Sequence, residues 1–128
     1  MTGGFDQQPK AEIHAMAHIT GGGLPEKLSR ALKPSQLGAE LYNPFEPCYL
    51  MTYLQKIGKI TDYNAYKAWN MGQGMVIITP EPENVIKIAR KYDLNSQVIG
   101  NVVRDQKIII KSKGAFAKQN EFLEYQLN

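Results

Sequence analysis

The chain has 128 residues, a formal net charge of +3 and a hydrophobic content of 43%, which indicates one soluble globular domain with a modest core. No apolar run approaches the ~20 residues of a membrane span, and residues 1–10 lack the apolar stretch of a secretory signal. Basic residues are spread along the sequence without interleaved aromatics, which argues against a nucleic-acid partner. The single cysteine, Cys48, excludes an internal disulfide and is typical of a reducing compartment. We therefore expect a cytoplasmic protein with neither a membrane nor a nucleic-acid partner.

The first third of the chain predicts a strand, a glycine turn and a helix. Residues 1–10 are polar and are expected to be flexible. Apolar and polar residues alternate over 13–20, which predicts a strand. After the glycines at 21–23, apolar residues at helical spacing predict a helix over 24–32.

The middle of the chain predicts a short strand over 39–42 and two helices. Asn43-Pro44-Phe45-Glu46 has the pattern of an N-cap, a first-turn proline and a first-turn acid, which places the start of the first helix there. We expect Gly58 to cap its C-terminus. A second helix is predicted over 62–69. The first helix carries an apolar stripe expected to pack in the core: Tyr49, Leu50, Tyr53, Leu54 and Ile57.

The last part of the chain predicts further strands. The uninterrupted apolar run at 75–79 is typical of a strand covered on both faces. Strands over 97–103 and 107–111 are expected to form a hairpin through a tight turn, whereas 115–128 fits either a helix or a strand. A helix over 83–92 is expected to bury Val85, Ile88, Ala89 and Tyr92. Strands mixed with helices predict an α/β (α+β) fold with a mixed sheet and helices packed on it.

The two histidines, His14 and His18, lie four residues apart. A strand would separate their rings by roughly 13 Å, too far for one ion, and the glutamate of a helical zinc motif is missing, so no metal site is expected. Two readings stay open. The histidines lie on a partly wet sheet face, or His18 faces a substrate beside the glycine turn.

The Gly21-Gly22-Gly23 turn is the strongest local feature of the sequence. Backbone N–H groups at a helix start attract anions, but the run fits neither the Walker loop nor the dinucleotide fingerprint. Glu26 in the first helical turn would repel a nearby phosphate. Close packing of the turn against a neighbouring strand is the alternative.

A second glycine-rich segment spans Asn70-Met71-Gly72-Gln73-Gly74. It predicts a bulge or a crowded turn between a helix and a strand. We expect the Asn70 amide to cap the preceding helix rather than to contact a ligand. Six tyrosines and the tryptophan are expected to pack mostly in the core with their polar groups at its rim: Tyr42, Tyr49, Tyr53, Tyr63, Tyr66, Tyr92 and Trp69. Cys48 is expected in a helical first turn, and we assign it no catalytic role.

Four segments in the same order resemble one family. They begin with the run from Ile13 through His18 to Gly23 and continue with Leu54-Gln55-Lys56-Ile57-Gly58-Lys59-Ile60. The other two are the run from Tyr66 to Met75 and Ile99-Gly100-Asn101-Val102-Val103. Together they resemble the C-terminal domain of phosphoribosylformylglycinamidine cyclo-ligase (AIR synthase), or of a related protein, over about residues 12–111.

The resemblance implies part of an ATP-dependent ring closure in purine biosynthesis that converts formylglycinamidine ribonucleotide to aminoimidazole ribonucleotide. In that family a phosphoryl transfer activates the formamide oxygen and an internal nitrogen then attacks. The implied domain covers 11–114, between a flexible segment 1–10 and a tail 115–128. The implied site has a catalytic His18 and substrate- or phosphate-binding residues Thr20, Gly21, Gly22, Gly23, Asn70, Gly72 and Gly74.

The sequence departs from this family in its N-terminal part and at four positions. Full-length members carry an N-terminal domain that supplies most of the ATP and Mg²⁺ site and the main dimer interface. We expect that domain or subunit to be the missing partner, the assembly to be a homo-oligomer, and the chain alone to be inactive. The usual residues are replaced by Lys27, Ser29, Trp69 and Gln73. The alternative is a non-enzymatic ribonucleotide- or phosphate-binding module, or a regulatory subunit.

Overall fold

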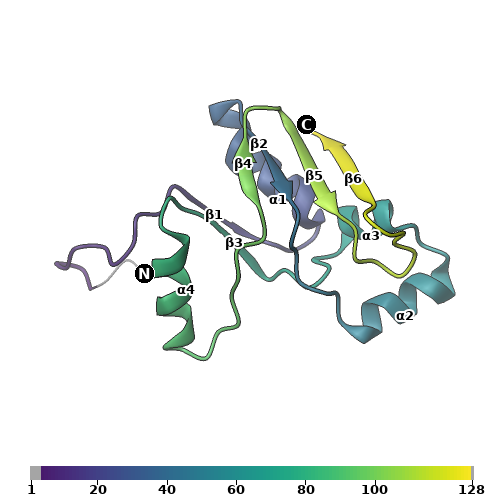
Figure 1. Ribbon diagram of the computed structural model, residues 1–128, viewed down its shortest axis with the longest axis horizontal. Helices are drawn as coiled ribbons and strands as arrows, with labels where there is room; N and C mark the ends of the chain where they lie inside the picture. The colour runs from purple at the N-terminus through teal and green to yellow at the C-terminus, as the bar shows by residue number, and fades with distance from the viewer. Residues whose placement is uncertain (1–3, 128) are drawn as a thin grey trace. The chain divides into compact units, whose positions relative to one another are not determined.

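The computed structural model describes residues 4–127, which form two compact units. The small unit contains the residues up to Met16 and 77–98, and the large unit contains 17–76 and the residues from Ile99 onward. Helices and a mixed sheet confirm the predicted α+β class (Figure 1). No helix among the described residues is long and apolar enough to cross a membrane. The predicted flexible segment lies partly outside the described residues, and the predicted domain boundaries stay predictions.

A two-stranded sheet joins β1 (Ala15–His18) to β3 (Met75–Ile78). The predicted alternation in β1 is confirmed, because Ala17 and Ile19 are buried while the residues between and before them are exposed. The prediction that β3 is covered on both faces is wrong. Met75 is half exposed and only Val76 is buried among the residues of the strand.

The small unit is organised around helix α4 (Pro82–Arg90). Val85 and Ala89 are buried as predicted, but Tyr92 lies beyond the end of the helix and is 68% exposed, so its predicted burial is wrong. The loop before α4 is held by the Glu12 backbone. Its N–H donates to the Glu81 carboxylate, and its carbonyl accepts from the Thr79 hydroxyl.

The large unit contains a four-stranded sheet in the order β4-β2-β5-β6 (Figure 1). Its strands are β2 (Gly38–Leu41), β4 (Asn101–Val103), β5 (Lys107–Lys111) and β6 (Phe122–Gln126). β2 is antiparallel to β4 and parallel to β5, and β6 is antiparallel to β5. The residues after Gly114, which fitted either a helix or a strand, therefore supply an edge strand.

The predicted hairpin between the strands at 97–103 and 107–111 is wrong, because β2 lies between them. The connection from Val103 to Lys107 is long enough to cross β2. Four Cα steps span up to ~15 Å, and the crossing needs about 10 Å. Gly38, the first residue of β2, lies against this connection. A Cβ at Gly38 would collide with the backbone at Asp105 and Lys107.

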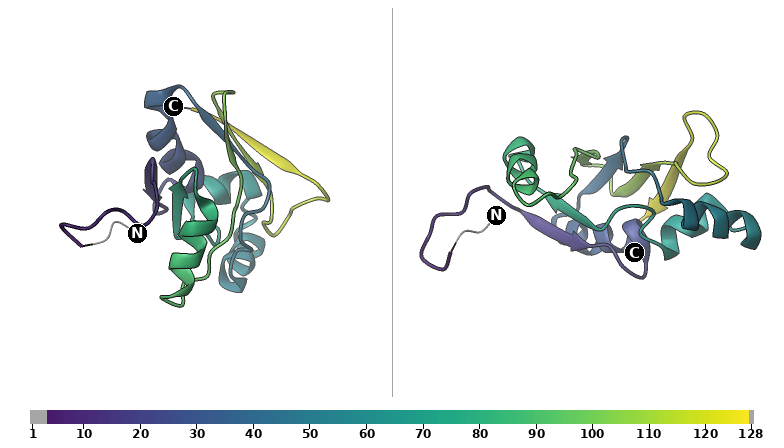
Figure 2. Two further views of the ribbon diagram at one scale, coloured as in Figure 1. Left: turned by 60° about the vertical axis from the view of Figure 1, so that its left-hand side comes forward. Right: turned by 90° about the horizontal axis from the view of Figure 1, so that it is seen from below.

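One face of the four-stranded sheet is buried under two helices, α1 (Gly23–Leu32) and α3 (Asp62–Ala68). Helix α1 continues into a single 3₁₀ turn, Lys33–Ser35. Figure 2 shows these helices from two further sides. Register places alternate residues of β2, β5 and β6 on the buried face. The resulting core contains Leu24, Leu28, Ala39, Leu41, Ala65, Tyr66, Ile108, Ile110, Leu123 and Tyr125.

Helix α2 (Tyr49–Gly58) differs most from its prediction. It begins at Tyr49 rather than at Pro44, because Pro47 disfavours helical geometry at Glu46. Residues 43–48 form a loop instead. The left-handed C-cap is Lys59 rather than Gly58. The predicted burial of the apolar stripe is wrong: Gln55 alone is buried in α2, and the five stripe residues are 44–80% exposed.

Candidate functional site

The three glycines of the turn have different surroundings, because one packs closely on backbone and another is open to solvent. Gly22 and Gly23 have positive φ values of 91° and 60°, and Gly22 is the N-cap of α1. A Cβ at Gly23 would collide with the Tyr66 carbonyl and lie 2.8 Å from the Trp69 carbonyl, so this glycine allows α1 to meet the end of α3. Gly21 is exposed, with nothing within 4 Å of a Cβ position.

Residues 70–74 form a tight turn of their own. The Gln73 N–H donates to the Asn70 carbonyl, and both central residues, Met71 and Gly72, have positive φ. This is the pattern of a type I′ turn. The Asn70 Oδ1 accepts from the Gly72 N–H at 3.1 Å. The predicted capping of the preceding helix by Asn70 is therefore wrong, because the amide braces the turn after α3 instead.

The structure brings these two segments together. The Ile19 N–H donates to the Gly74 carbonyl at 3.0 Å, and Gly23 packs on the carbonyls just before Asn70. His18, Thr20, Gly21, Gly72 and Gly74 are all exposed. We call residues 18–23 and 70–74 the paired segments. All eight predicted site residues lie on them.

The backbone donors of the glycine turn differ in availability. The Gly23 N–H donates to the Thr20 carbonyl at 2.9 Å, which closes the turn. Within residues 4–127, the N–H groups of Gly21 and Gly22 have no hydrogen-bond partner. Two adjacent free N–H groups at the start of a helix attract an anion.

The Glu26 side chain lies beside the glycine turn. Its carboxylate folds back over Gly22, where it would collide with a Cβ, and it also pairs with the Arg30 guanidinium one turn later. The carboxylate therefore occupies the positive end of the α1 dipole. Glu26 is exposed, and Arg30 partly compensates its charge. An incoming phosphate would have to displace it.

The two histidines lie in different surroundings. The His14 ring forms a hydrogen bond with the Glu12 carboxylate at 2.8 Å. His18 and Thr20 are exposed, and their side chains have no hydrogen-bond partner within the described part of the chain. No group of three or more histidine, cysteine, aspartate or glutamate side chains among residues 4–127 could hold a metal ion. Cys48 is exposed and is the N-cap of α2.

Gln73 is a framework residue rather than a ligand contact. Its side chain is buried, accepts from the Phe45 N–H at 2.8 Å, and donates to the carbonyls of Phe45 and Met71. It thus fixes the loop before α2 against the turn at 70–74. A glutamine can satisfy both the donor and the acceptor of one backbone residue.

A buried polar cluster, which sequence reasoning missed, lies between α2, α3 and the loop after β5. The Asp62 carboxylate accepts from Gln55 Nε2 at 2.8 Å, from Ser112 Oγ at 2.7 Å and from the Phe116 N–H at 3.1 Å. Gln55 Oε1 accepts from the Ala115 N–H. The only sequence signal was a glutamine within an apolar stripe. The cluster anchors the loop that leads into β6.

Two buried tyrosines border this cluster. The Tyr66 hydroxyl accepts from the Lys113 N–H at 3.3 Å, and burial raises the pKa of Tyr66 to about 12. Burial also raises the pKa of Tyr125, whose hydroxyl donates to the Tyr63 carbonyl and whose ring stacks on Tyr63. The predicted core burial holds for Tyr66 alone among the tyrosines that were predicted to pack in the core. The exposed ones are Tyr42, Tyr49, Tyr53, Tyr63 and Tyr92.

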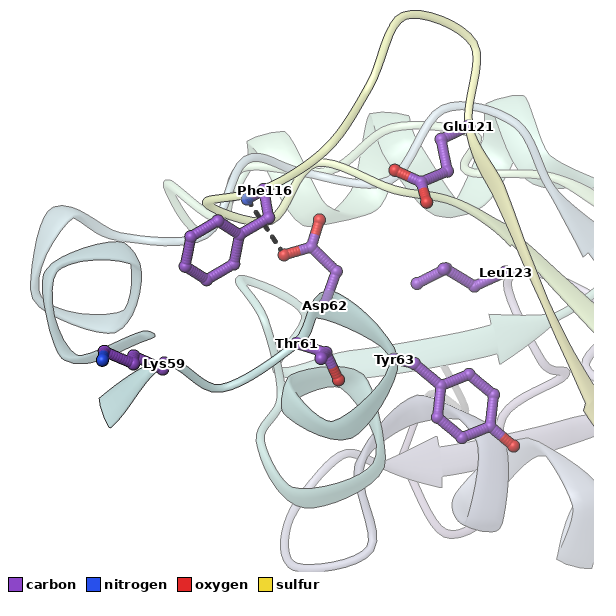
Figure 3. Close-up of a pocket in the computed structure, with 7 residues that line it drawn as sticks. All are labelled: Lys59, Thr61, Asp62, Tyr63, Phe116, Glu121 and Leu123. Carbon is purple, nitrogen blue, oxygen red and sulfur yellow. Dashed lines mark hydrogen bonds between the residues drawn. The ribbon is translucent and has the colours of Figure 1, made fainter. Parts of the chain in front are cut away.

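An open cavity of about 470 Å³ lies beside the cluster and away from the predicted site. Figure 3 shows its seven lining residues, with the Asp62 carboxylate bonded to the Phe116 backbone. None of the eight predicted site residues lines it. The residues that line the cavity are Lys59, Thr61, Asp62, Tyr63, Phe116, Glu121 and Leu123.

Comparison with known proteins assigns the family. A family profile described as "AIR synthase related protein, C-terminal domain" matches residues 5–113. The chain belongs to this family. The profile contains both paired segments and ends just before the loop that leads to β6.

Three similar curated proteins are each named phosphoribosylformylglycinamidine cyclo-ligase. The chain is 39% identical to the protein of Methanosarcina barkeri over 99 residues, which cover 77% of this chain and 28% of that protein. It is 38% identical to the protein of a Picosynechococcus strain (76% and 29% covered). It is also 38% identical to the protein of Pseudothermotoga lettingae (77% and 30% covered). The chain thus spans less than a third of the length of these relatives.

Proposed function

We propose that this chain supplies the ribonucleotide-binding wall of an ATP-dependent cyclo-ligase that converts formylglycinamidine ribonucleotide to aminoimidazole ribonucleotide in purine biosynthesis. The observation that carries the proposal is the pairing of residues 18–23 with 70–74 through the bond from Ile19 to Gly74. This pairing gathers exposed polar groups and free backbone donors in a chain whose curated relatives are named as that enzyme.

The phosphate of the ribonucleotide is assigned to the free N–H groups of Gly21 and Gly22. Gly21 leaves room for a ligand to approach the backbone, and the α1 dipole favours negative charge there. Phosphate binding requires the Glu26 carboxylate to move away from Gly22. The Glu26 side chain is exposed, and Arg30 remains as its ion-pair partner after the movement. Gly23 and Gln73 hold the two backbones in register without contacting the substrate.

The reacting end of the substrate is assigned to His18, Thr20 and Asn70. The His18 imidazole has free nitrogens on the exposed face of β1, so it can donate a hydrogen bond to an oxygen that gains charge during the reaction. The Asn70 Oδ1 is held by Gly72, which leaves its Nδ2 free as a donor. These donors orient the substrate amide for attack.

Residues 4–127 contain no group of three histidine, cysteine, aspartate or glutamate side chains that could hold a metal ion, and the family resemblance places ATP and Mg²⁺ mainly in an N-terminal domain. We therefore assign both to a part of the enzyme outside these 128 residues, which also supplies the contacts of a homo-oligomer. We assign the protein to the cytoplasm. No reaction step through ATP or Mg²⁺ is attributed to this chain.

A chimeric enzyme tests the proposal. The 99-residue region of the Methanosarcina barkeri protein that matches this chain is replaced by the corresponding residues of this chain, and ATP-dependent ring closure is measured. We expect turnover, and we expect His18→Ala to lower kcat/KM at least tenfold. His14→Ala is the matched control, because His14 bonds Glu12 outside the paired segments. A folded chimera that binds the ribonucleotide without turnover would instead support a non-enzymatic module.

A further inference from the structure

Helix α2 is inverted relative to an ordinary surface helix. At roughly 100° per residue, Gln55 lies nearly opposite the middle of the stripe formed by Tyr49, Leu50, Tyr53, Leu54 and Ile57. Gln55 is fully buried, and the five apolar residues are 44–80% exposed. A helix on the surface of a soluble domain ordinarily turns its apolar face inward. We call these five residues the α2 face.

The buried polar side of α2 is fixed, so the helix cannot rotate to hide its apolar side. Gln55 donates to Asp62 and to the Ile60 carbonyl, and it accepts from the Ala115 N–H at 3.0 Å. Rotation would leave these buried groups without partners, at about 1–3 kcal/mol for each. The α2 face is therefore held outward by the fold.

The size of the α2 face indicates a protein partner. Its two tyrosines stack with ring centroids 5.9 Å apart. The five side chains expose on the order of 500 Å² of apolar surface, a size at which patches on soluble proteins mark interaction sites. Tyrosine is also enriched at the centres of protein interfaces.

The α2 face is continuous with the candidate site. The loop before α2 packs on the turn at 70–74, because a Cβ at Gly72 would lie 2.5 Å from the Glu46 carbonyl. Gln73 binds the Phe45 backbone in the same loop. A body seated on the α2 face would therefore lie next to one of the paired segments.

The charge of the α2 region restricts the kind of partner surface that could bind there. Residues 48–61 contain Lys56 and Lys59 but no acidic residue, and the whole chain has a net charge of +3. An apolar surface with an acidic rim complements this region, whereas a second copy of this chain would add positive charge to positive charge. The relatives carry about seventy per cent of their length outside the match, so they contain a body that could fill this role.

We propose that the α2 face is the docking surface for the ATP-binding part of the enzyme that lies outside these 128 residues, a body with an apolar patch and an acidic rim. The inference rests on the proposed function for the identity of the occupant. Docking there sets the nucleotide against the 70–74 side of the ribonucleotide site. The lysines at the end of α2 fix its orientation.

The experiment compares the 128-residue chain with the chimera described above by hydrogen exchange. We expect residues 49–57 to gain at least tenfold protection in the chimera. We also expect the double variant Tyr53→Lys, Ile57→Lys to remove this protection and to lower the melting temperature of the chimera. Leu94→Lys is the matched control, because Leu94 is 61% exposed and lies in the small unit. It should change neither measurement.

Several outcomes would overturn the docking proposal. Equal exchange of 49–57 in the chain and in the chimera is one. A discrete dimer of the 128-residue chain in light scattering that the double variant dissociates is another, because the occupant would then be a second copy. If no chimera folds, the docking proposal is tested on the isolated chain by light scattering and by the stability of the double variant. The proposal expects a stability unchanged within experimental error for the isolated chain, and a large loss contradicts it.

The outcomes separate this inference from the proposed function. A chimera with a protected α2 face that does not catalyse ring closure supports the docking surface and contradicts the function. A chimera that turns over at the same rate with and without the double variant, and leaves 49–57 unprotected, supports the function and contradicts the docking surface.

Discussion

Asp62 is the residue on which the framework of the large unit depends most. It is 5% exposed and accepts from two side chains and one backbone N–H, which come from α2, the end of β5 and the loop beyond it. Gly114 is required beside it, because a Cβ there would lie against the carboxylate. One side chain thus joins α2 and the loop after β5 to the start of α3.

Replacing Asp62 by alanine removes the acceptor from two buried side-chain donors, Gln55 and Ser112, and from the partly buried N–H of Phe116. At about 1 kcal/mol or more for each donor, Asp62→Ala should lower the free energy of unfolding by about 3 kcal/mol, measured by urea denaturation. Asp105→Ala is the control, because Asp105 is exposed and should change stability by no more than about 0.5 kcal/mol. Equal effects of the two substitutions would contradict the structural role of the cluster.

Tyr66 gives the protein a stability that depends on pH in the alkaline range. Burial raises its pKa from 10.0 to about 12, so the folded state keeps a proton that the unfolded state releases. The contribution is fully present below pH 10 and is lost as the pH rises towards 12, by about 2–3 kcal/mol. Tyr66→Phe should reduce this decline, as measured by denaturation at pH 9 and pH 12. The same decline in both proteins would show that another group causes it.

Glycines illustrate what a single residue type can and cannot predict. Three glycines in a row indicated a close approach, but the pattern could not tell a ligand from a neighbouring backbone. The structure divides them, since Gly23 meets the end of α3 while Gly21 faces open space. The difference depends on α3, which lies forty residues away in sequence.

At the scale of elements, local patterns predicted α1, α3 and β1 well. α1 and β1 carry a regular apolar period whose apolar side is buried, so the local signal and the tertiary environment agree. The start of α2 was misjudged because the capping pattern at Asn43 was read without the effect of Pro47. Its orientation was misjudged because an apolar stripe does not reveal whether the partner lies in the same unit.

Strand pairing was the least predictable feature. Two strands separated by three residues favour a hairpin, yet β2 enters between β4 and β5 from sixty residues upstream. Nothing local reports this insertion except Gly38, whose backbone must pass close to the β4–β5 connection. The β6 segment was also undecided, because residues 115–128 fitted either a helix or a strand and only the pairing with β5 decides between them.

Substitutions on β6 test its assignment as a strand. Tyr125 is 3% exposed and packs on α3, whereas Phe122 lies on the opposite face and is 46% exposed. Tyr125→Ala should lower the free energy of unfolding by about 3–5 kcal/mol, and Phe122→Ala by less than about 1 kcal/mol. Thermal or urea denaturation measures both. Comparable losses would contradict the alternation that a strand imposes.

At the scale of the whole molecule, the chain is a member of the AIR synthase related C-terminal domain family that spans less than a third of its curated relatives. It presents two surfaces in the large unit, the exposed paired segments and the α2 face, joined by the loop at residues 43–48. The sequence anticipated the first of these by resemblance. It missed the second, because exposure of an apolar face depends on what lies outside these residues.

The central claim is that the paired segments bind the ribonucleotide, and an amide titration of the ¹⁵N-labelled chain tests it most directly. Addition of formylglycinamidine ribonucleotide should shift the N–H resonances of Gly21, Gly22 and Gly74, with little change at Phe116 and Leu123 beside the cavity of about 470 Å³. Shifts confined to that cavity, or no shifts at millimolar ribonucleotide, would contradict the account.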